Sequence, residues 1–542
     1  MFKLSFKNNF IIYIFVFLTN ISLLFSYSFD PTNQFILLDD GRYAIFHGVN
    51  VVVKLPPFIP DTEKFSPEFS FNDDDIKILK HLGMNLVRLG IIWESIEYSE
   101  GQYNYTHLEK ISQIVSKLEK NNITVIVDVH QDMFSRLFCG EGAPKFYVDK
   151  LSYSQDCNTN LISKFFGLLN ACIPLSKHKW SYDKDGLPEI KDCKAGSFID
   201  YHKSPELMSV YDSFFKNQSG VLDAFVEFWK FLGNKFKNRK NVLGYDIWNE
   251  PWASNLWTDL KSLLPGYIDN HILIDFYSKI NDGISQVDPN YTMIFQPIPF
   301  PDILPLFGGH ALPGFKKAPV NTTLRKQMLN VHSYCCAADQ NICKDGEPKA
   351  KDYPKCSDFH DRKLKKNKQQ AIDIGVPLIA TEFGACSSSK ACYLEMLGFE
   401  KAAEKYLISW TYWMYKSYND HTTTAHEGQE GIFNSDGTVQ NLKEKALSRT
   451  YILYYQGIPK SFKFDDNNKN FEAEFVYDKS INKPSVIYFN KNYYYEKGYD
   501  LKIMDKNNTI IDGVEITEEG NYINFFIDNT DGIEVKVNLV AL

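Results

Sequence analysis

Two glutamates stand at the ends of apolar runs, where a pair of carboxyl groups could carry out acid–base chemistry. Glu250 lies in Gly244–Pro251 (GYDIWNEP), and Glu382 lies in Val376–Gly384 (VPLIATEFG). Short apolar runs of this kind are typical of buried parallel strands, whose carboxyl ends meet at one face of a barrel. Such a pair suits cleavage of a glycosidic bond, because one group protonates the departing oxygen while the other meets the cationic sugar carbon.

The separation of the two carboxyl groups would decide the stereochemistry. Groups about 5 Å apart allow direct attack on the sugar carbon, which retains its configuration. We expect Glu250 to stay protonated because like-charge repulsion from Glu382 raises its pKa. A single glutamate at a strand end could equally form a salt bridge, so it is the pair that favours catalysis.

The elements that must position these glutamates alternate between strand and helix. Eight short β-branched runs are predicted strands, namely Phe46–Val53, Asn85–Gly90, Thr124–His130, Leu243–Asn249, Thr292–Gln296, Met328–Tyr334, Leu378–Phe383 and Ile408–Tyr412. Between them lie predicted helices at Asp74–Leu82, Leu108–Lys120, Val221–Phe236, Asp275–Val287, Leu364–Ile374 and Tyr393–Tyr406. This order predicts an α/β fold, the (β/α)₈ TIM barrel, with Glu250 and Glu382 on strands four and seven.

The pattern changes near residue 457. A predicted helix at Asn441–Tyr454 leads to a Gly-Ile-Pro turn, and short alternating segments follow at Phe471–Tyr477, Ser485–Phe489, Leu501–Met504, Tyr522–Ile527 and Ile533–Leu539. These segments predict a small all-β sandwich. We therefore divide the chain into a signal peptide at 1–28, the catalytic barrel at 29–456 and a C-terminal domain at 457–542. A packing brace is the favoured role of that last domain, with sugar or membrane binding as alternatives.

The N-terminus predicts export. Lys3 and Lys7 precede an apolar run from Phe10 to Phe25, which is followed by small residues. The run is shorter than the roughly 20 apolar residues of a membrane span, although a retained signal anchor is the alternative. We expect a secreted protein, or one in the lysosomal or endosomal lumen.

The cysteines and sequons agree with export. The ten cysteines are 139, 157, 172, 193, 335, 336, 343, 356, 386 and 392. Their clustering predicts local disulfides in an oxidising compartment, and their spacing matches no zinc site, so neither a metal nor a cofactor is expected. Six N-glycosylation sequons fit a glycoprotein, at Asn104, Asn122, Asn217, Asn290, Asn321 and Asn507.

The charge balance argues against a nucleic-acid partner. The chain carries 59 basic and 67 acidic residues, a net charge of −8 without long runs of either sign. A phosphate backbone attracts concentrated positive charge, which this chain lacks. We therefore expect no nucleic-acid partner, and we expect a monomer.

Several motifs over roughly residues 30–455 together resemble glycoside hydrolase family 5. They are Asn249-Glu250-Pro251, Thr381-Glu382-Phe383-Gly384, Arg88, His130, His332-Ser333-Tyr334 and Trp413. Three further stretches look like endoglycoceramidases within that family, namely His47–Lys54, Trp93-Glu94 and Asp128–Arg136. A trailing β domain is also expected of that group.

The resemblance implies a retaining enzyme that cuts the β-glucosyl bond between an oligosaccharide and the primary hydroxyl of ceramide. It implies that Glu250 is the acid/base and Glu382 the nucleophile. Asn249 would bond the sugar 2-hydroxyl, Tyr334 would orient the nucleophile, and Trp413 would lie under the reacting sugar. Lys54, Asp128, His130 and Asp132 would contact sugar hydroxyls, while Arg88 and His332 would hold the nucleophile region.

Plainer roles remain open for some of these residues. Arg88 could be a structural ion pair, Trp413 could be plain core, and Asp128 and Lys54 could serve as scaffold. The resemblance also implies a glycosphingolipid substrate and transient contact with a membrane or micelle. The apolar stretches 55–60 and 297–315 could accommodate ceramide, or could simply pack on the barrel.

Other functions of the same fold stay in view. The nearest alternatives are an endo-β-glucanase, a mannanase or a glucosylceramidase, because loop shape sets substrate specificity. A more distant alternative is a non-catalytic barrel that binds carbohydrate or lipid. The presence of both glutamates argues against that last possibility.

Overall fold

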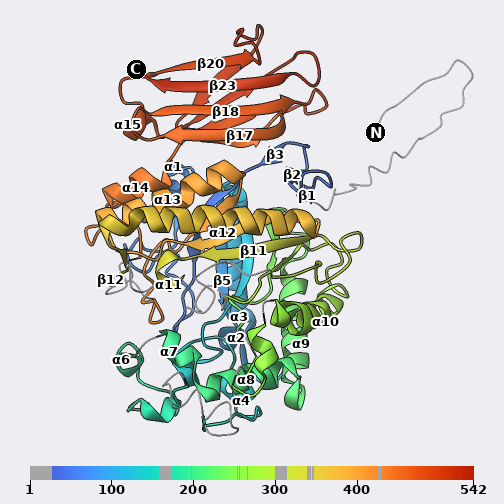
Figure 1. Cartoon of the computed structure of the whole chain (residues 1–542), viewed down its shortest axis with the longest axis vertical. Coiled ribbons are helices and arrows are strands. Elements are labelled where there is room, and N and C mark those ends of the chain that lie inside the picture. The colour runs from blue at the N-terminus through green and yellow to red at the C-terminus, as the bar shows by residue number, and fades with distance from the viewer. Residues whose placement is uncertain are drawn as a thin grey trace, which may run out of the picture.

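A closed barrel of eight parallel strands forms the centre of the molecule (Figure 1). This is a computed structural model, and it describes residues 27–157, 172–423 and 430–542, except 197, 253, 256, 265, 300–313, 339–342 and 345–346. In chain order the barrel strands are β4 (His47–Val51), β5 (Leu86–Ile92), β8 (Thr124–His130), β9 (Val242–Asp246), β10 (Met293–Phe295), β11 (Gln327–Ser333), β14 (Leu378–Phe383) and β15 (Ser409–Tyr412). The predicted TIM barrel is confirmed, and β9 and β14 are its fourth and seventh strands.

Helices surround the barrel because each carries one apolar face. In α3 (Tyr105–Lys120) the buried Leu108, Ile111, Val115 and Leu118 recur at helical spacing. The other long helices are α1 (Asp73–His81), α8 (Pro205–Phe215), α9 (Val221–Phe236), α10 (Ile274–Ile284), α12 (Tyr353–Asp373) and α13 (Lys390–Tyr406). Shorter ones are α2 (Trp93–Ile96), α4 (Lys145–Val148), α6 (Ile190–Cys193), α7 (Phe198–His202), α11 (Cys335–Ala338), α14 (Asn441–Leu447) and α15 (Lys491–Tyr494).

A two-sheet sandwich packs on the end of the barrel away from the two glutamates. One antiparallel sheet contains β17 (Gly457–Asp465), β18 (Asn470–Tyr477), β23 (Glu534–Ala541) and β20 (Tyr499–Asp505). The other contains β1 (Tyr27–Phe29), β2 (Ile36–Leu38), β3 (Tyr43–Ala44), β16 (Tyr451–Tyr455), β19 (Ser485–Tyr488), β22 (Tyr522–Phe526) and β21 (Glu515–Glu519). The sandwich therefore draws on strands from both sides of the expected 456–457 boundary.

The sandwich and the barrel share buried contacts. The imidazole of His47, at the start of β4, stacks on Tyr451 of β16 with ring centroids 3.6 Å apart. Gly83 has a φ of 72°, and a Cβ there would lie 2.4 Å from the Tyr488 ring, so close packing requires glycine. Arg449 donates to Glu404 of α13 and to the carbonyl oxygen of Phe464 in β17. These contacts make the sandwich a fixed support for the barrel.

Some predicted boundaries were wrong. The helix predicted at Asn441–Tyr454 ends at Leu447, and Tyr451–Tyr455 form β16 because Tyr451 and Tyr455 are needed in the sandwich core. Strands β17 and β21 were not predicted. Residues 27 and 28, assigned to the signal peptide, pair with β2 in β1. The rest of that segment and most of the apolar stretch 297–315 lie outside the described residues.

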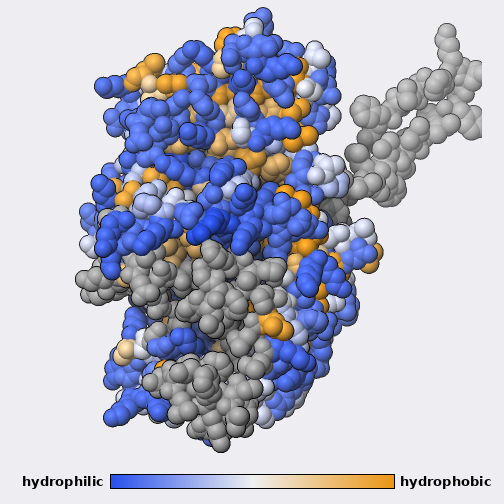
Figure 2. All heavy atoms as spheres, viewed as in Figure 1, coloured by the Kyte–Doolittle hydropathy of each residue, from blue (hydrophilic) through white to orange (hydrophobic). Residues whose placement is uncertain are grey.

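Five disulfides confirm the predicted oxidised cysteines. They join Cys139–Cys193, Cys157–Cys172, Cys335–Cys356, Cys336–Cys343 and Cys386–Cys392. Four of the five close loops of 21 residues or fewer, as the clustering indicated. Among the described helices, none is long and apolar enough to cross a membrane. In Figure 2 the surface over α12 is hydrophilic, whereas hydrophobic residues gather at the upper right on the sandwich.

Candidate active site

The two predicted glutamates meet at the carboxyl end of the barrel. Glu250 follows β9 and Glu382 lies on β14. One carboxylate oxygen of each lies within 4.8 Å of the other and of a His332 ring nitrogen. This closeness is the separation expected of a retaining pair, whose carboxyl groups stand about 5 to 5.5 Å apart.

Glu250 sits on a strained turn rather than on a strand. Strand β9 ends at Asp246, four residues earlier than Glu250, and the φ of Glu250 is 40°, in the left-handed region. Its backbone N–H donates to Gln296 Oε1, and Gln131 Nε2 donates to its carbonyl oxygen. Such strain persists only where surrounding contacts fix it, and it is frequent at active sites.

The acidity of Glu250 suits an acid catalyst. Burial raises its pKa to about 7, and the charge of Asp132 adds to the increase. Repulsion from Glu382, the cause that the sequence suggested, is not among the main contributors. The carboxyl group therefore holds a proton in mildly acidic solution for a different reason than expected: it is poorly solvated.

Glu382 is held by donors on both of its oxygens. Arg88 Nη1 lies 2.8 Å from Oε1, and the Tyr334 hydroxyl donates to Oε2 at 2.8 Å. Burial raises its pKa to about 7, as high as that of Glu250, although the charges of His332 and Arg88 act against that increase. Donors that favour the ionised form are what a carboxylate nucleophile requires.

His332 lies between the two glutamates. Its Nδ1 is 2.8 Å from Glu250 Oε1 and 3.3 Å from Glu382 Oε2. The sequence placed His332 beside the nucleophile, whereas the structure brings it closer to the predicted acid. Burial lowers the pKa of His332 to about 4, so the ring is neutral near neutral pH.

Arg88 bonds to several of the buried polar residues around the two glutamates. Its guanidinium is fully buried and forms ion pairs with Asp128, Asp246 and Glu382. It also donates to Asn50 Oδ1 at 3.1 Å and to Asn249 Oδ1 at 2.9 Å. A planar donor with five N–H groups can hold several acceptors at once. The ion pair proposed as an alternative role for Arg88 is thus part of the site itself.

A second cluster of charged residues, centred on Lys54, belongs to the same site as the Arg88 network. Lys54 Nζ donates to Asp132 at 2.6 Å and to Thr422 at 2.6 Å, and it lies 3.0 Å from Asp420. The ammonium also stands 4.6 Å from the centroid of the Trp413 ring. These groups offer both donors and acceptors next to an aromatic face, a combination that suits a sugar.

Asp128, predicted to contact a sugar hydroxyl, is already engaged by protein groups. Asp128 is fully buried, and its two oxygens are engaged by Arg88 Nη2 and by His130 Nδ1 at 2.7 Å. It therefore orients these two residues, and each of its oxygens already accepts one hydrogen bond. His130 keeps Nε2 for other partners, and its ring stacks on Trp413 with centroids 5.1 Å apart. The remaining predicted residues all lie together at this end of the barrel.

Sequence reasoning missed several residues of the site. Asp246, Gln296, Asn330 and Thr381 form hydrogen bonds around the two glutamates, and Asp420 faces Lys54. Asp246 and Thr381 stand in the same motifs as Glu250 and Glu382. Their polarity inside otherwise apolar strands was the available signal, because a buried polar side chain requires partners.

Two clusters have donor atoms close enough to consider for a metal. They are Glu250 with His332 and Glu382, and His130 with Asp132 and Glu141. In the first cluster, Arg88 and Tyr334 already donate hydrogen bonds to the Glu382 carboxylate. In the second cluster, Lys54 forms an ion pair with Asp132. A cation would have to displace an existing positive charge from each cluster.

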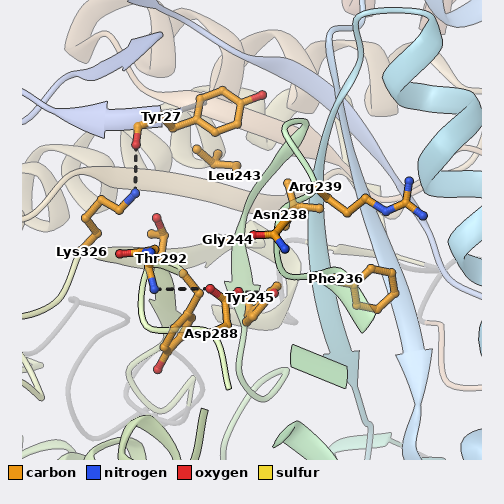
Figure 3. A pocket seen from close by; sticks show the side chains of 13 residues that line it. Tyr27, Phe236, Asn238, Arg239, Leu243, Gly244, Tyr245, Asp288, Thr292 and Lys326 are labelled. Atoms are coloured by element: carbon orange, nitrogen blue, oxygen red, sulfur yellow. Dashed lines mark hydrogen bonds between the residues drawn. The ribbon is translucent and has the colours of Figure 1, made fainter. Parts of the chain in front are cut away.

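A polar depression of about 60 Å³ lies at the opposite end of the barrel (Figure 3). Gly244, Thr292 and Lys326 line it, close to the amino ends of β9, β10 and β11. Lys326 Nζ donates to the Tyr27 carbonyl oxygen there. Enzymes with this fold react at the carboxyl face, so this depression is separate from the chemistry.

A closed parallel barrel with paired glutamates after its fourth strand and on its seventh defines a glycoside hydrolase. The model of the cellulase family (glycosyl hydrolase family 5) matches residues 57–166 and 184–419, and the family 5 C-terminal domain matches 449–538. The chain belongs to glycosyl hydrolase family 5 and, within it, to the endoglycoceramidases.

Individual relatives support this assignment over nearly the whole chain. An endoglycoceramidase of Cyanea nozakii is 29% identical over 90% of this chain and 89% of its own. Another, of Hydra vulgaris, is 30% identical over 88% of this chain and 83% of its own. The fold is that of endo-glycoceramidase II from Rhodococcus sp. in its ganglioside GM3 complex, with a TM-score of 0.69, 18% identity, and coverage of 94% and 100%.

Proposed function

We propose that the protein hydrolyses the bond between the oligosaccharide and the ceramide of glycosphingolipids, with retention at the sugar carbon. One observation carries the chemistry: two buried carboxyl groups have oxygens within 4.8 Å of each other and pKa values that burial raises to about 7, and Glu382 alone of the two accepts hydrogen bonds from Arg88 and Tyr334. The substrate class follows from the relatives, which are named endoglycoceramidases.

The first step forms a covalent sugar ester. The Glu382 carboxylate attacks the anomeric carbon while Glu250 gives its proton to the departing ceramide oxygen, so the C–O bond breaks as the ester forms. Arg88 and Tyr334 hold Glu382 in line, because each donates to one of its oxygens. The buried Asn249 side chain accepts from Arg88 through Oδ1, and we assign it to contact with the sugar 2-hydroxyl.

The second step returns the enzyme to its starting state. Glu250, now a carboxylate, removes a proton from water, and the hydroxide attacks the same carbon as the ester to Glu382 breaks. Two inversions give net retention. Apart from this water and the substrate, no group outside the chain is needed to balance either step.

The sugar next to the cleaved bond has a polar receptor in the chain. Lys54 and Asp132 present a donor and an acceptor, and Trp413 presents an aromatic face. His130 can accept through Nε2, since Nδ1 is bonded to Asp128. We assign these four residues to sugar recognition and Asp128 to support.

We extend the proposal to the cellular location and the oligomeric state of the protein. The predicted signal peptide and five disulfides support a secreted or lysosomal protein. We further propose that it is a monomer and that it meets its substrate at a membrane or micelle surface. Flotation with glycolipid-containing vesicles, and the mass of the secreted protein by light scattering, would test these statements.

The decisive experiment uses lactosylceramide in detergent micelles, with products separated by chromatography. We expect the parent protein to release intact lactose and ceramide. Glu382→Gln should show no turnover. Glu250→Gln should lose turnover of lactosylceramide but still react with an activated aryl β-lactoside, whose leaving group needs no proton.

A matched control separates chemistry from packing. Glu400 is a buried glutamate of α13 that lies 3.7 Å from Arg449 Nε, outside the group of residues around the two catalytic glutamates, so Glu400→Gln removes a carboxyl group of the same shape elsewhere in the barrel. That variant should keep activity. Release of single sugars, or cleavage only of a polysaccharide, would support a glycosidase activity but would contradict the assignment of glycosphingolipids as the substrate.

A further inference from the structure

A chain of hydrogen bonds runs behind the two glutamates and ends at His332. It passes from Asp246 through Asn330 and Thr381 to the far side of the His332 ring. Asn330 and Thr381 are fully buried and do not reach the carboxyl groups themselves. The direction of each bond can be worked out from the chemistry of its partners.

Asn330 has one possible orientation. Its Nδ2 lies 2.8 Å from Asp246 Oδ2, a carboxylate oxygen that accepts, so the amide nitrogen must face that side. Around Asp246 the other partners, Arg88 and Gln296, are also donors. The Oδ1 of Asn330 is thereby turned toward Thr381 as an acceptor.

Thr381 has a single hydroxyl hydrogen, and Asn330 takes it. The Oγ1 of Thr381 lies 2.7 Å from Asn330 Oδ1, which also accepts the Thr381 backbone N–H. Since that hydrogen is used, Oγ1 can only accept from its other neighbour. That neighbour is His332 Nε2, at 3.1 Å.

His332 is neutral in its surroundings. Its ring faces Glu382 on β14, Asp246 on β9, Arg88 on β5 and Lys363 on α12, besides Glu250. Burial, together with the charges of Arg88 and Lys363, outweighs the carboxylates of Glu382 and Asp246 and lowers the His332 pKa to about 4. A neutral imidazole carries one N–H. With that hydrogen on Nε2, Nδ1 holds a lone pair aimed at Glu250 Oε1.

We propose that Asn330 and Thr381 are positioning residues that fix His332 as its Nε2–H tautomer, and that the bare Nδ1 keeps the catalytic proton on Glu250. At 2.8 Å from Glu250 Oε1, a bare nitrogen requires the hydrogen to belong to the carboxyl group. The opposite tautomer would donate to Glu250 and stabilise its charged form. The hydrogen-bond chain through Asn330 and Thr381 to His332 therefore keeps Glu250 protonated before substrate binds.

The same arrangement resets the enzyme after each bond cleavage. When Glu250 has given its proton to the leaving oxygen, its carboxylate faces a lone pair and receives no hydrogen bond from His332. That makes the carboxylate a stronger base toward the incoming water, whose proton restores the Glu250–His332 bond.

The test removes one hydroxyl. Thr381→Val has nearly the same shape but cannot accept from Nε2, so His332 should change to the Nδ1–H tautomer and donate to Glu250. The pKa of Glu250 should fall by about one unit, the worth of one hydrogen bond. Thr381→Ser restores the hydroxyl and should restore the parent value.

A control variant lies on the next strand. Thr411 is equally buried, on β15, and its hydroxyl donates to the Thr381 carbonyl oxygen without touching His332. Thr411→Val therefore removes a hydroxyl from the same region and should leave the Glu250 pKa at the parent value. Thr381→Ala serves as a second hydroxyl deletion where the valine variant fails to fold.

Two readouts distinguish this inference from the proposed function on which it rests. Difference infrared titration of the Glu250 carboxyl group, assigned with Glu250→Gln backgrounds, needs no substrate. The basic limb of kcat/KM for lactosylceramide should shift by the same amount to lower pH, while kcat falls more than KM changes. If the parent protein does not react with lactosylceramide, the glycolipid assignment is rejected. The infrared titration would still show whether Thr381 controls the Glu250 pKa through His332.

Two outcomes would overturn the proposal. One is an unchanged Glu250 titration in Thr381→Val. The other is an equal shift in Thr381→Ser or Thr411→Val, which would make the effect one of packing rather than of tautomer choice.

Discussion

The barrel and the sandwich bury opposite kinds of side chain. At the carboxyl end of the barrel, Arg88, Asp128 and Asp246 are completely buried. The sandwich core is apolar and largely aromatic, built from residues such as Phe462, Phe471, Phe475 and Phe525. Buried charge costs free energy even when it is paired, whereas buried aromatic surface stabilises. The catalytic residues of this chain thus lie where burial of charge costs the most folding free energy. Burial of apolar surface in other regions offsets that cost.

The joint between the two regions shows how compensation is arranged. The N-terminal strands and β16 cover the closed end of the barrel with apolar residues such as Ile36, Ala44 and Phe46. The open end can then hold charge without exposing the barrel core. If this division is correct, changes at the open end should affect activity first, and changes in the sandwich should affect stability alone.

The largest expected effect is on turnover. Glu382→Gln removes the nucleophile and should lower kcat by at least about 10³-fold, while the thermal midpoint stays close to that of the parent. Single-turnover assays and calorimetry on the same sample would measure both. A drop in the midpoint comparable to a core deletion would show that the glutamate also holds the barrel together.

Arg88→Met should affect both quantities. It leaves three carboxyl groups without their shared cation, which should cost about 3–5 kcal/mol of unfolding free energy and abolish activity. Denaturant titration and the lactosylceramide assay would check this. Full stability in this variant would mean that the carboxyl groups simply take up protons.

Phe475→Ala is the matching change in the sandwich. Loss of this fully buried ring should cost about 3–5 kcal/mol of unfolding free energy, yet leave kcat per folded molecule at the parent value. The comparison fails if kcat falls in proportion to stability, because the sandwich would then contribute to the geometry of the site.

The pH dependence sharpens the comparison further. Glu250 must be protonated and Glu382 ionised in the first step, and burial raises both pKa values to about 7. Activity is therefore lost as the pH rises through the Glu250 pKa, and also as it falls through the Glu382 pKa. We expect kcat/KM for lactosylceramide to fall above the Glu250 pKa. With an activated aryl lactoside the fall should be weaker, and an equal fall for both substrates would assign it to another group.

The smallest expected effect is at the joint. Gly83→Ala puts a Cβ against the Tyr488 ring at a positive φ and should cost about 1–3 kcal/mol. Its kcat should not change. Thermal unfolding followed with the activity assay would detect any coupling between the joint and the site.

The sequence predicted most of the barrel because local pattern and burial agree there. Strands β8 and β14 have the bounds that their apolar runs indicated, and the glutamates are found where barrel geometry requires. The helix predicted after Asn441 was wrong from Ser448 on, because the aromatic residues of Tyr451–Tyr455 fit either a helix or a strand. Only pairing with β3 and β19, far away in sequence, decides between them.

The sequence by itself determined the fold class, the two glutamates and most of the residues that surround them. The tertiary structure alone decided which groups each residue contacts: that Asp128 is bonded to Arg88 and His130, that His332 lies nearer to Glu250 than to Glu382, and that Thr381 and Asn330 stand behind it. The physical reason is that residue type and spacing specify local conformation. Hydrogen-bond direction and solvation instead depend on neighbours brought together from distant strands.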